Sequence, residues 1–226
     1  MKIFIKIIVL ITIAGFVSVL PSCDSQSEDS SSKPTLTLNM EVAGYGVTQQ
    51  APVTVDGKEV ADASIAVNGE TIPYDTNEGK YMKLPMADSV VENDEVILEF
   101  EHQGLTAGAT GAIPGGITVQ EPLDGATVSA GDSIDVSWTS SSTPDRVRIQ
   151  VTDDVSSEEL LDESVYDGST SYTIEANTIS SGASQAEIAV SVFDYYEVTS
   201  EDFAVNESES ALEARINEAV ITLNVN

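Results

Sequence analysis

Residues 35–42 (TLTLNMEV) place an apolar side chain at every second position: Leu36, Leu38, Met40 and Val42. Successive side chains of a β-strand point to opposite faces, so this period predicts a strand with one buried face. The polar residues between them would face solvent, as is typical of an antiparallel sheet with one side against a core.

The same alternation recurs along the next 75 residues, each time close to a turn signal. Ile65 and Val67 precede Asn68-Gly69, which is a strong hairpin signal because both turn residues tolerate a positive φ. Further strands are predicted around 53–55, 96–100, 105–110 and 117–119. We therefore expect a first β-sandwich over residues 35–116.

A second set of strands begins near Ile117. Trp138 shares one strand face with Ile134 and Val136, and residues 186–193 (AEIAVSVF) are apolar on both faces, which predicts a central strand. Two strand faces complete the pattern: Val147, Ile149 and Val151 inward with Arg146, Arg148 and Gln150 outward, and Ile221, Leu223 and Val225 inward near the end. Residues 209–217 fit either one helical turn or a strand. The predicted fold is all-β, with two tandem immunoglobulin-like antiparallel sandwiches, the second over 117–226.

The N-terminus predicts export. Lys2 and Lys6 precede an apolar run over residues 7–20, which is too short for an ordinary membrane-spanning helix and ends at Pro21. Leu20, Pro21, Ser22 and Cys23 follow in order, and this segment resembles a bacterial lipoprotein signal, in which a small residue precedes the cysteine that receives lipid. The resemblance implies a signal peptide over 1–22, lipid on Cys23 and membrane attachment through that lipid.

Residues 23–34 are expected to form a flexible tether after the lipidated cysteine, because 25–34 (SQSEDSSSKP) contain no apolar residue that could be buried. The acids Asp24, Glu28 and Asp29 resemble the surface-export signals of some Bacteroidota lipoproteins. We therefore expect a bacterial cell-envelope protein at the outer membrane, with exposure at the cell surface as one option.

The chain carries 9 basic and 38 acidic residues. Loss of Lys2 and Lys6 with the signal peptide would change the formal charge from −29 to −31. Such a charge disfavours nucleic acid and anionic lipid as partners and favours a monomer. High-salt adaptation, carboxylate calcium sites and a solvated surface each explain it; the calcium candidates, 92–95 (ENDE) and Asp153-Asp154, lack the EF-hand spacing.

Two modules resemble known families. Residues 60–69 (VADASIAVNG), 75–81 (DTNEGKY) and Leu84-Pro85 look like the carboxypeptidase regulatory-like domains of bacterial surface proteins, although Asp75-Thr76 replaces the usual Thr-Asp. Residues 121–139, from Glu121-Pro122 to Trp138-Thr139, look like Ig-like domains of exported and wall-associated proteins. Both motifs are structural, and the resemblance implies modules without catalytic residues.

The sequence contains few residues that could support catalysis or bind a metal ion. His102 is the only histidine and Cys23 the only cysteine, so a disulfide and a zinc site are not expected, and neither a nucleophile elbow nor a phosphate-binding loop is present. We predict no enzymatic activity, no cofactor and no metal. A hydrolase would need carboxylates or His102 to converge in one pocket.

The aromatic side chains are the best indication of binding. Tyr166, Tyr172, Tyr195 and Tyr196 are the candidate ligand-binding residues of the second module, and adjacent Tyr195 and Tyr196 must point to opposite faces of a strand. The competing explanation is that Trp138 and most of these tyrosines pack in the core or shield strand edges. The expected function is adhesion or structural spacing, with a surface glycan or envelope protein as partner; the alternative is a carbohydrate-binding accessory lipoprotein of a polysaccharide-uptake system.

Overall fold

A computed structural model describes residues 32–44, 46–86, 91–153, 156–166, 168–180, 182–216 and 219–226. The predicted signal peptide, Cys23 and the tether up to residue 31 lie outside the described residues. Within the described part of the chain, no helix is long and apolar enough to cross a membrane. Residues 33–226 form one compact unit.

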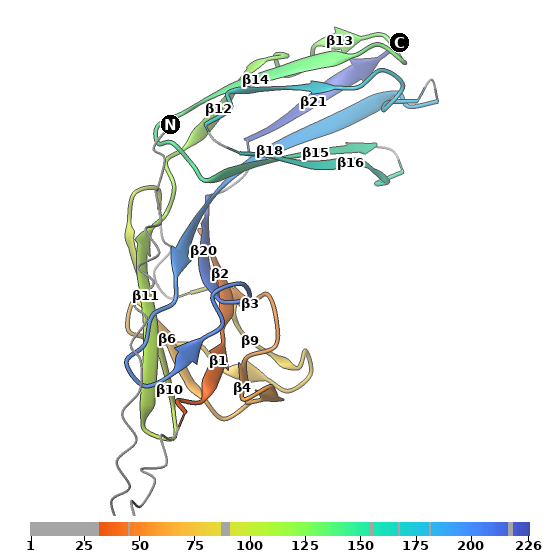
Figure 1. Ribbon diagram of the computed structural model, residues 1–226. Helices are drawn as coiled ribbons and strands as arrows, with labels where there is room; N and C mark the ends of the chain where they lie inside the picture. The colour runs from red at the N-terminus through yellow and green to blue at the C-terminus, as the bar shows by residue number, and fades with distance from the viewer. Residues whose placement is uncertain are drawn as a thin grey trace, which may run out of the picture. The chain divides into compact units, whose positions relative to one another are not determined.

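The described secondary structure consists of strands, which confirms the predicted all-β class (Figure 1). In chain order the strands are β1 (Thr35–Thr37), β2 (Asn39–Ala43), β3 (Gly46–Gln49), β4 (Thr54–Val55), β5 (Lys58–Glu59), β6 (Ser64–Val67), β7 (Glu70–Thr71), β8 (Tyr74–Asp75), β9 (Lys80–Lys83), β10 (Glu95–His102), β11 (Leu105–Ala112), β12 (Ile117–Glu121), β13 (Thr127–Val128), β14 (Ile134–Ser140), β15 (Arg146–Asp153), β16 (Glu159–Tyr166), β17 (Ser171–Ile174), β18 (Gln185–Glu197), β19 (Ala204–Val205), β20 (Ala211–Arg215) and β21 (Ala219–Val225).

The predicted hairpin at Asn68-Gly69 is confirmed. It joins β6 to β7, and φ is +50° at Asn68 and +76° at Gly69, the left-handed conformations that a type I′ turn requires. The turn Asp56-Gly57 has the same character and joins β4 to β5. These turns bring neighbouring strands together and fix which side chains face the core.

Two hydrophobic cores result. The first contains the alternating residues Leu36, Leu38, Met40 and Val42, each fully buried, together with Phe100 of β10. The second is built around Trp138, which is 3% exposed, with the inward residues of β15 and β18 packed beside it. The predicted inward residues of these strands are therefore confirmed.

Strand β18 runs from one sandwich into the other (Figure 1), and its side chains contribute to both cores. Residues 185–190 pair with β21, and residues 193–197 pair with β20, so one strand of 13 residues passes from one sandwich to the other. Its core-facing side chains are at even-numbered positions and therefore share one face of the strand: Val190 and Val192 lie in the second core, and Tyr196 packs on the first. Both cores thus lie on the same face of this continuous sheet.

The boundary predicted between the two sandwiches, at residues 116/117, does not match the way residues are divided between the two cores. Val198, Phe203, Leu212 and Ala214, predicted to lie in the second sandwich, are buried in the first core. Residues 209–217, left open between helix and strand, contain β20, which lies parallel to β2. β1–β19 and β13–β21 are also parallel pairs, so the sheets are not purely antiparallel.

Candidate functional site

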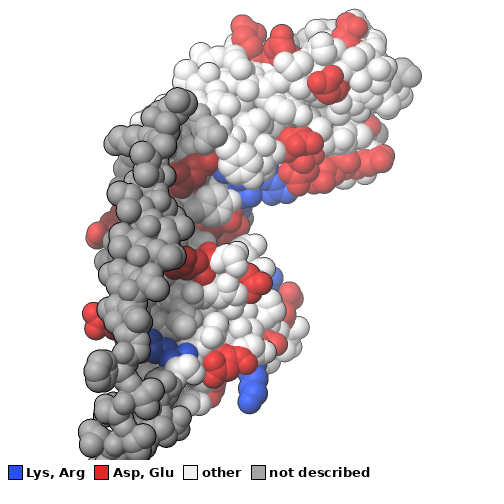
Figure 2. All heavy atoms as spheres, in the orientation of Figure 1, with Lys and Arg blue, Asp and Glu red and all other residues white. Residues whose placement is uncertain are grey.

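All three arginines of the chain lie on one face of the continuous sheet, the face turned away from the two cores. Arg146 and Arg148 alternate with the core residues of β15, and Arg215 ends β20 next to the core residue Ala214. We call this surface the arginine face; besides the arginines it carries Phe193, Tyr195 and Tyr166. In Figure 2 the basic side chains there form a blue band bordered by red carboxylates.

The register of the strands aligns part of this face in a single row. Tyr166 of β16 lies opposite Arg146 of β15, Arg146 lies opposite Phe193 of β18, and Phe193 lies opposite Arg215 of β20. Neighbouring strands are about 4.8 Å apart, so these four side chains cross the sheet as direct neighbours.

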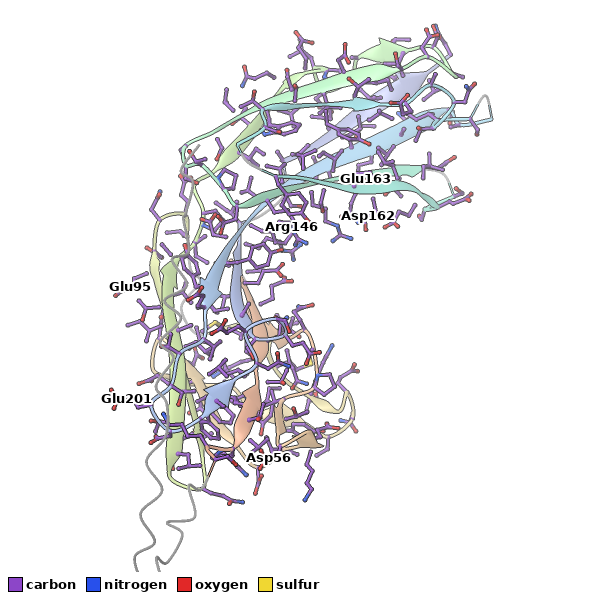
Figure 3. The ribbon with its side chains drawn as sticks, viewed as in Figure 1. Asp56, Glu95, Arg146, Asp162, Glu163 and Glu201 are labelled. Carbon is purple, nitrogen blue, oxygen red and sulfur yellow. The ribbon has the colours of Figure 1, made fainter. Side chains whose placement is uncertain are left out.

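Each arginine is paired with a carboxylate. Arg148 donates two hydrogen bonds to Asp162, of 2.7 and 2.6 Å, in the bidentate arrangement that matches guanidinium to carboxylate. Arg146 Nη2 lies 3.1 Å from Glu213, and Arg215 Nη2 lies 3.2 Å from Glu41. Figure 3 labels Arg146 and Asp162, which project from the same side of β15 and β16.

The guanidinium groups also cover aromatic rings. Arg146 Cζ lies 4.1 Å from the centre of the Phe193 ring and 5.2 Å from that of Tyr195, and Arg215 Cζ lies 5.8 Å from Phe193. These are cation–π distances. Phe193 is 2% exposed although it points away from both cores, because the two arginines shield it.

Partial burial changes the acidity of the face. Burial raises the pKa of Glu213 against the lowering effect of Arg146, and burial raises the pKa of Tyr195, with nearby Glu213 acting in the same direction. The hydrogen bonds from Arg148 lower the pKa of Asp162. Burial and ion pairing thus shift the pKa values of Glu213 and Asp162 in opposite directions.

Two aspartates connect the strands beside this face. Asp194 accepts a hydrogen bond of 3.0 Å from the backbone of Asp145, and Asp145 accepts one of 2.9 Å from the backbone of Tyr195. Burial raises the pKa of Asp194, and the nearby Asp145 carboxylate adds to the rise. This reciprocal capping fixes the start of β15 against β18.

The four predicted tyrosines do not form one platform. Tyr166, 56% exposed, and Tyr195 lie on the arginine face. Tyr196 packs on the first core and donates a 2.8 Å hydrogen bond to the carbonyl oxygen of Ala112. Tyr172 packs against the second core from β17. Their ligand-binding role stays a prediction, and the structure brings only Tyr166 and Tyr195 to one surface.

The structure also places the other candidates. His102 is buried at the end of β10, and its Nδ1 lies 3.5 Å from Asp62. Among the calcium candidates, Glu92 and Asp94 accept backbone hydrogen bonds, as does Asp153 from Ser156; Asp154 lies outside the described residues. The described residues contain no group of three or more His, Cys, Asp or Glu that could hold a metal ion.

Sequence reasoning placed Arg146 and Arg148 outward but did not single them out as functional. The signal that could have found them is compositional: three arginines in a strongly acidic chain, two of them at i and i+2 on one strand face. Arg215 joins them only through the pairing of β18 with β20, which the local sequence does not encode.

No family model matches the chain, and no curated protein matches it. Among solved structures, the chain is similar to the fibronectin(III)-like modules of Clostridium thermocellum CbhA, with 13% identity, 88% of this chain and 92% of that chain covered, and a TM-score of 0.33. It is also similar to the Ig1 and Ig2 domains of DIP-gamma, with 9% identity, 86% and 98% coverage and a TM-score of 0.22. No functional residue is transferred from either.

Proposed function

We propose that this protein is a non-enzymatic, lipid-anchored component of the bacterial cell envelope whose two sandwiches act as a spacer and carry a binding face. The observation that supports it most is strand β18, which is shared by both cores. Tandem domains joined by a simple linker are expected to move relative to each other, whereas a shared sheet resists bending.

Further contacts between the two parts support a spacer. Ile216 packs against both cores, and the ion pair of Arg146 with Glu213 joins β15 of the second sandwich to β20 of the first. The backbone hydrogen bonds of the sheet and the aspartate pair at Asp145 and Asp194 act at the same place. These contacts resist bending between the two sandwiches, as a spacer requires.

The anchor remains a proposal from the N-terminal sequence. Lipid on Cys23, followed by a polar tether, would hold the folded unit at a membrane, and two or more acyl chains give stable attachment. We propose the outer membrane as the site, with the sandwiches on the cell surface.

Absence of catalysis is proposed on the chemistry of the described side chains. The only histidine is buried beside a single carboxylate, and the acids with shifted pKa values bind arginines or backbone groups. These roles are structural and place no nucleophile beside a general base.

The test is protease accessibility of intact cells that express the wild-type protein or Cys23→Ala. Proteinase K is preferable to trypsin because basic residues are few. A membrane-bound form that is cleaved on intact cells, and lost in Cys23→Ala, would support the proposal. A membrane-bound form that resists cleavage until the cells are lysed would contradict surface presentation and indicate a role between the membranes.

A second candidate function, a carbohydrate-binding accessory lipoprotein of a polysaccharide-uptake system, is favoured by one observation. Tyr166 exposes more than half of its surface directly beside the paired arginines, which is the position of a ring available for stacking. Binding of soluble polysaccharide by the purified lipoprotein tests it.

A further inference from the structure

We propose that the arginine face binds a chain of neutral pyranose sugars, with Tyr166 as the stacking ring and the Arg148–Asp162 pair as the hydroxyl-binding group. This inference rests on the proposed function of a spacer that carries a binding face. It assigns the ligand class and the residues that would contact the ligand.

The charges of the face argue for a neutral ligand. Each arginine is already neutralised by a carboxylate: Arg146 by Glu213, Arg148 by Asp162 and Arg215 by Glu41. An anionic ligand would have to displace these carboxylates, and the strongly acidic chain around the face would repel it.

The hydrogen-bonding groups suit sugar hydroxyls, which donate and accept at once. A bidentate guanidinium–carboxylate pair presents donors and acceptors in one plane. Arg148 and Asp162 keep 31% and 35% of their side-chain surface exposed, so a ligand can reach them, and the Gln150–Glu159 bond of 3.2 Å adds a second pair one step along the same two strands. Asp162 also has lone-pair capacity beyond its two bonds to Arg148.

The aromatic part provides an apolar surface next to these groups. Tyr166 is 56% exposed and lies opposite Arg146, which is two residues from Arg148 on the same strand face, and Asp162 lies four residues from Tyr166 along β16. The apolar C–H face of a pyranose ring can pack on such a ring while its hydroxyls reach the neighbouring polar pairs. The combination of an exposed ring and polar pairs on one sheet face fits a sugar chain better than a compact apolar molecule, which needs an enclosed pocket.

The face is ordered before any ligand arrives. The two residues of each ion pair are fixed by their mutual contacts, and the Arg146–Glu213 and Arg215–Glu41 pairs keep only 14–21% of their side-chain surface exposed. Long charged side chains otherwise lose much conformational entropy on binding. A preordered face reduces that cost.

The experiment measures binding by isothermal titration calorimetry on the full lipidated protein in non-ionic detergent. The probes are soluble neutral polysaccharides (xyloglucan, galactomannan, laminarin and dextran) and the anionic alginate and polygalacturonate. We expect binding to at least one neutral polysaccharide and none to the anionic ones. Tyr166→Ala should weaken the affinity by about tenfold, which corresponds to about 1.4 kcal/mol.

Asp162→Asn replaces one carboxylate oxygen, a proposed hydroxyl acceptor, with an amide donor and removes the charge that pairs with Arg148, so it should weaken binding to a similar degree. Asp135→Asn is the matched control, since Asp135 is an exposed acid that bonds Thr173 on the other sheet of the same sandwich. Because Tyr166 is exposed, Tyr166→Ala should keep the wild-type melting temperature and remains informative even if Asp162→Asn fails to fold. Binding only to anionic polysaccharides, binding unchanged in Tyr166→Ala, or no binding to any member of the panel would each overturn the inference. The proposed spacer function would stand or fall separately, on the protease experiment.

Discussion

Gly111 lies where strand β11 passes the ring of Tyr196, and a methyl group there should destabilise the protein. A Cβ built on Gly111 would be 2.1, 2.2 and 2.4 Å from Cδ2, Cε2 and Cγ of Tyr196. Ordinary carbon–carbon contact is about 3.5 Å or more, so the ring would have to retreat by roughly 1.4 Å. The ring is held by packing on the first core and by its hydrogen bond to the carbonyl oxygen of Ala112.

The magnitude of Gly111→Ala follows from three contributions. Overpacking typically costs about 1–3 kcal/mol. Loss of the Tyr196 hydrogen bond adds about 1 kcal/mol. The reduced entropy of the unfolded chain offsets about 0.4–1 kcal/mol of this total. We therefore expect a decrease of about 2 kcal/mol in the free energy of unfolding, measured by urea denaturation.

The control is Gly182→Ala. A Cβ at Gly182 would meet only Ser180 Oγ, at an ordinary distance of 3.8 Å, so this variant should be neutral or slightly stabilising. The mechanism is isolated by repeating Gly111→Ala in a Tyr196→Ala background, where the clash is absent. An equal cost of Gly111→Ala in both backgrounds, or no cost in the wild-type background, would refute the reasoning.

Three further predictions concern the cores and the place where they join. Asp194→Asn should raise the thermal midpoint at pH 7, because burial and Asp145 raise the pKa of Asp194 and thus penalise its charged form; the gain should vanish as the pH falls below the unfolded-state pKa of about 3.9, and a gain independent of pH would contradict this sign. Trp138→Ala should cost about 3–5 kcal/mol and still give one unfolding transition by circular dichroism, because both cores share β18; two separated transitions would count against coupling. Arg146→Met should cost about 1–3 kcal/mol at pH 7, since it leaves Glu213 partly buried without its partner, and less at pH 5, where Glu213 is more protonated; an equal loss in denaturation midpoint at both pH values would contradict it.

The sequence predicted local structure well wherever a short-range rule applies. The Asn68-Gly69 turn requires positive φ at two residues, and only a few residue types allow it, so the hairpin could be located from two letters. The inward faces of β2, β14 and β15 followed from alternation alone, since a strand with one buried face has a period of two.

The pairing of distant strands could not be predicted from local sequence patterns. Alternation shows that Leu212 and Ala214 are buried on one face, but not that β20 pairs with β2, which is about 170 residues earlier in the chain. For the same reason the arginine face could be predicted only in part. Arg146 and Arg148 share a strand, whereas Arg215 and Glu213 come from a segment whose secondary structure was left open.

The pairing of β1 with β19 and of β2 with β20 has a consequence for the order in which the protein can fold. A chain that emerges N-terminus first presents Thr35 long before Ala204, its partner in β1–β19, and the first core lacks Phe203 and Leu212 until nearly the whole chain is out. The N-terminal sandwich therefore cannot close ahead of the C-terminal one, and such distant contacts favour slow folding. The chain would stay incompletely packed until its last strands are available, and would gain its final form in one late step.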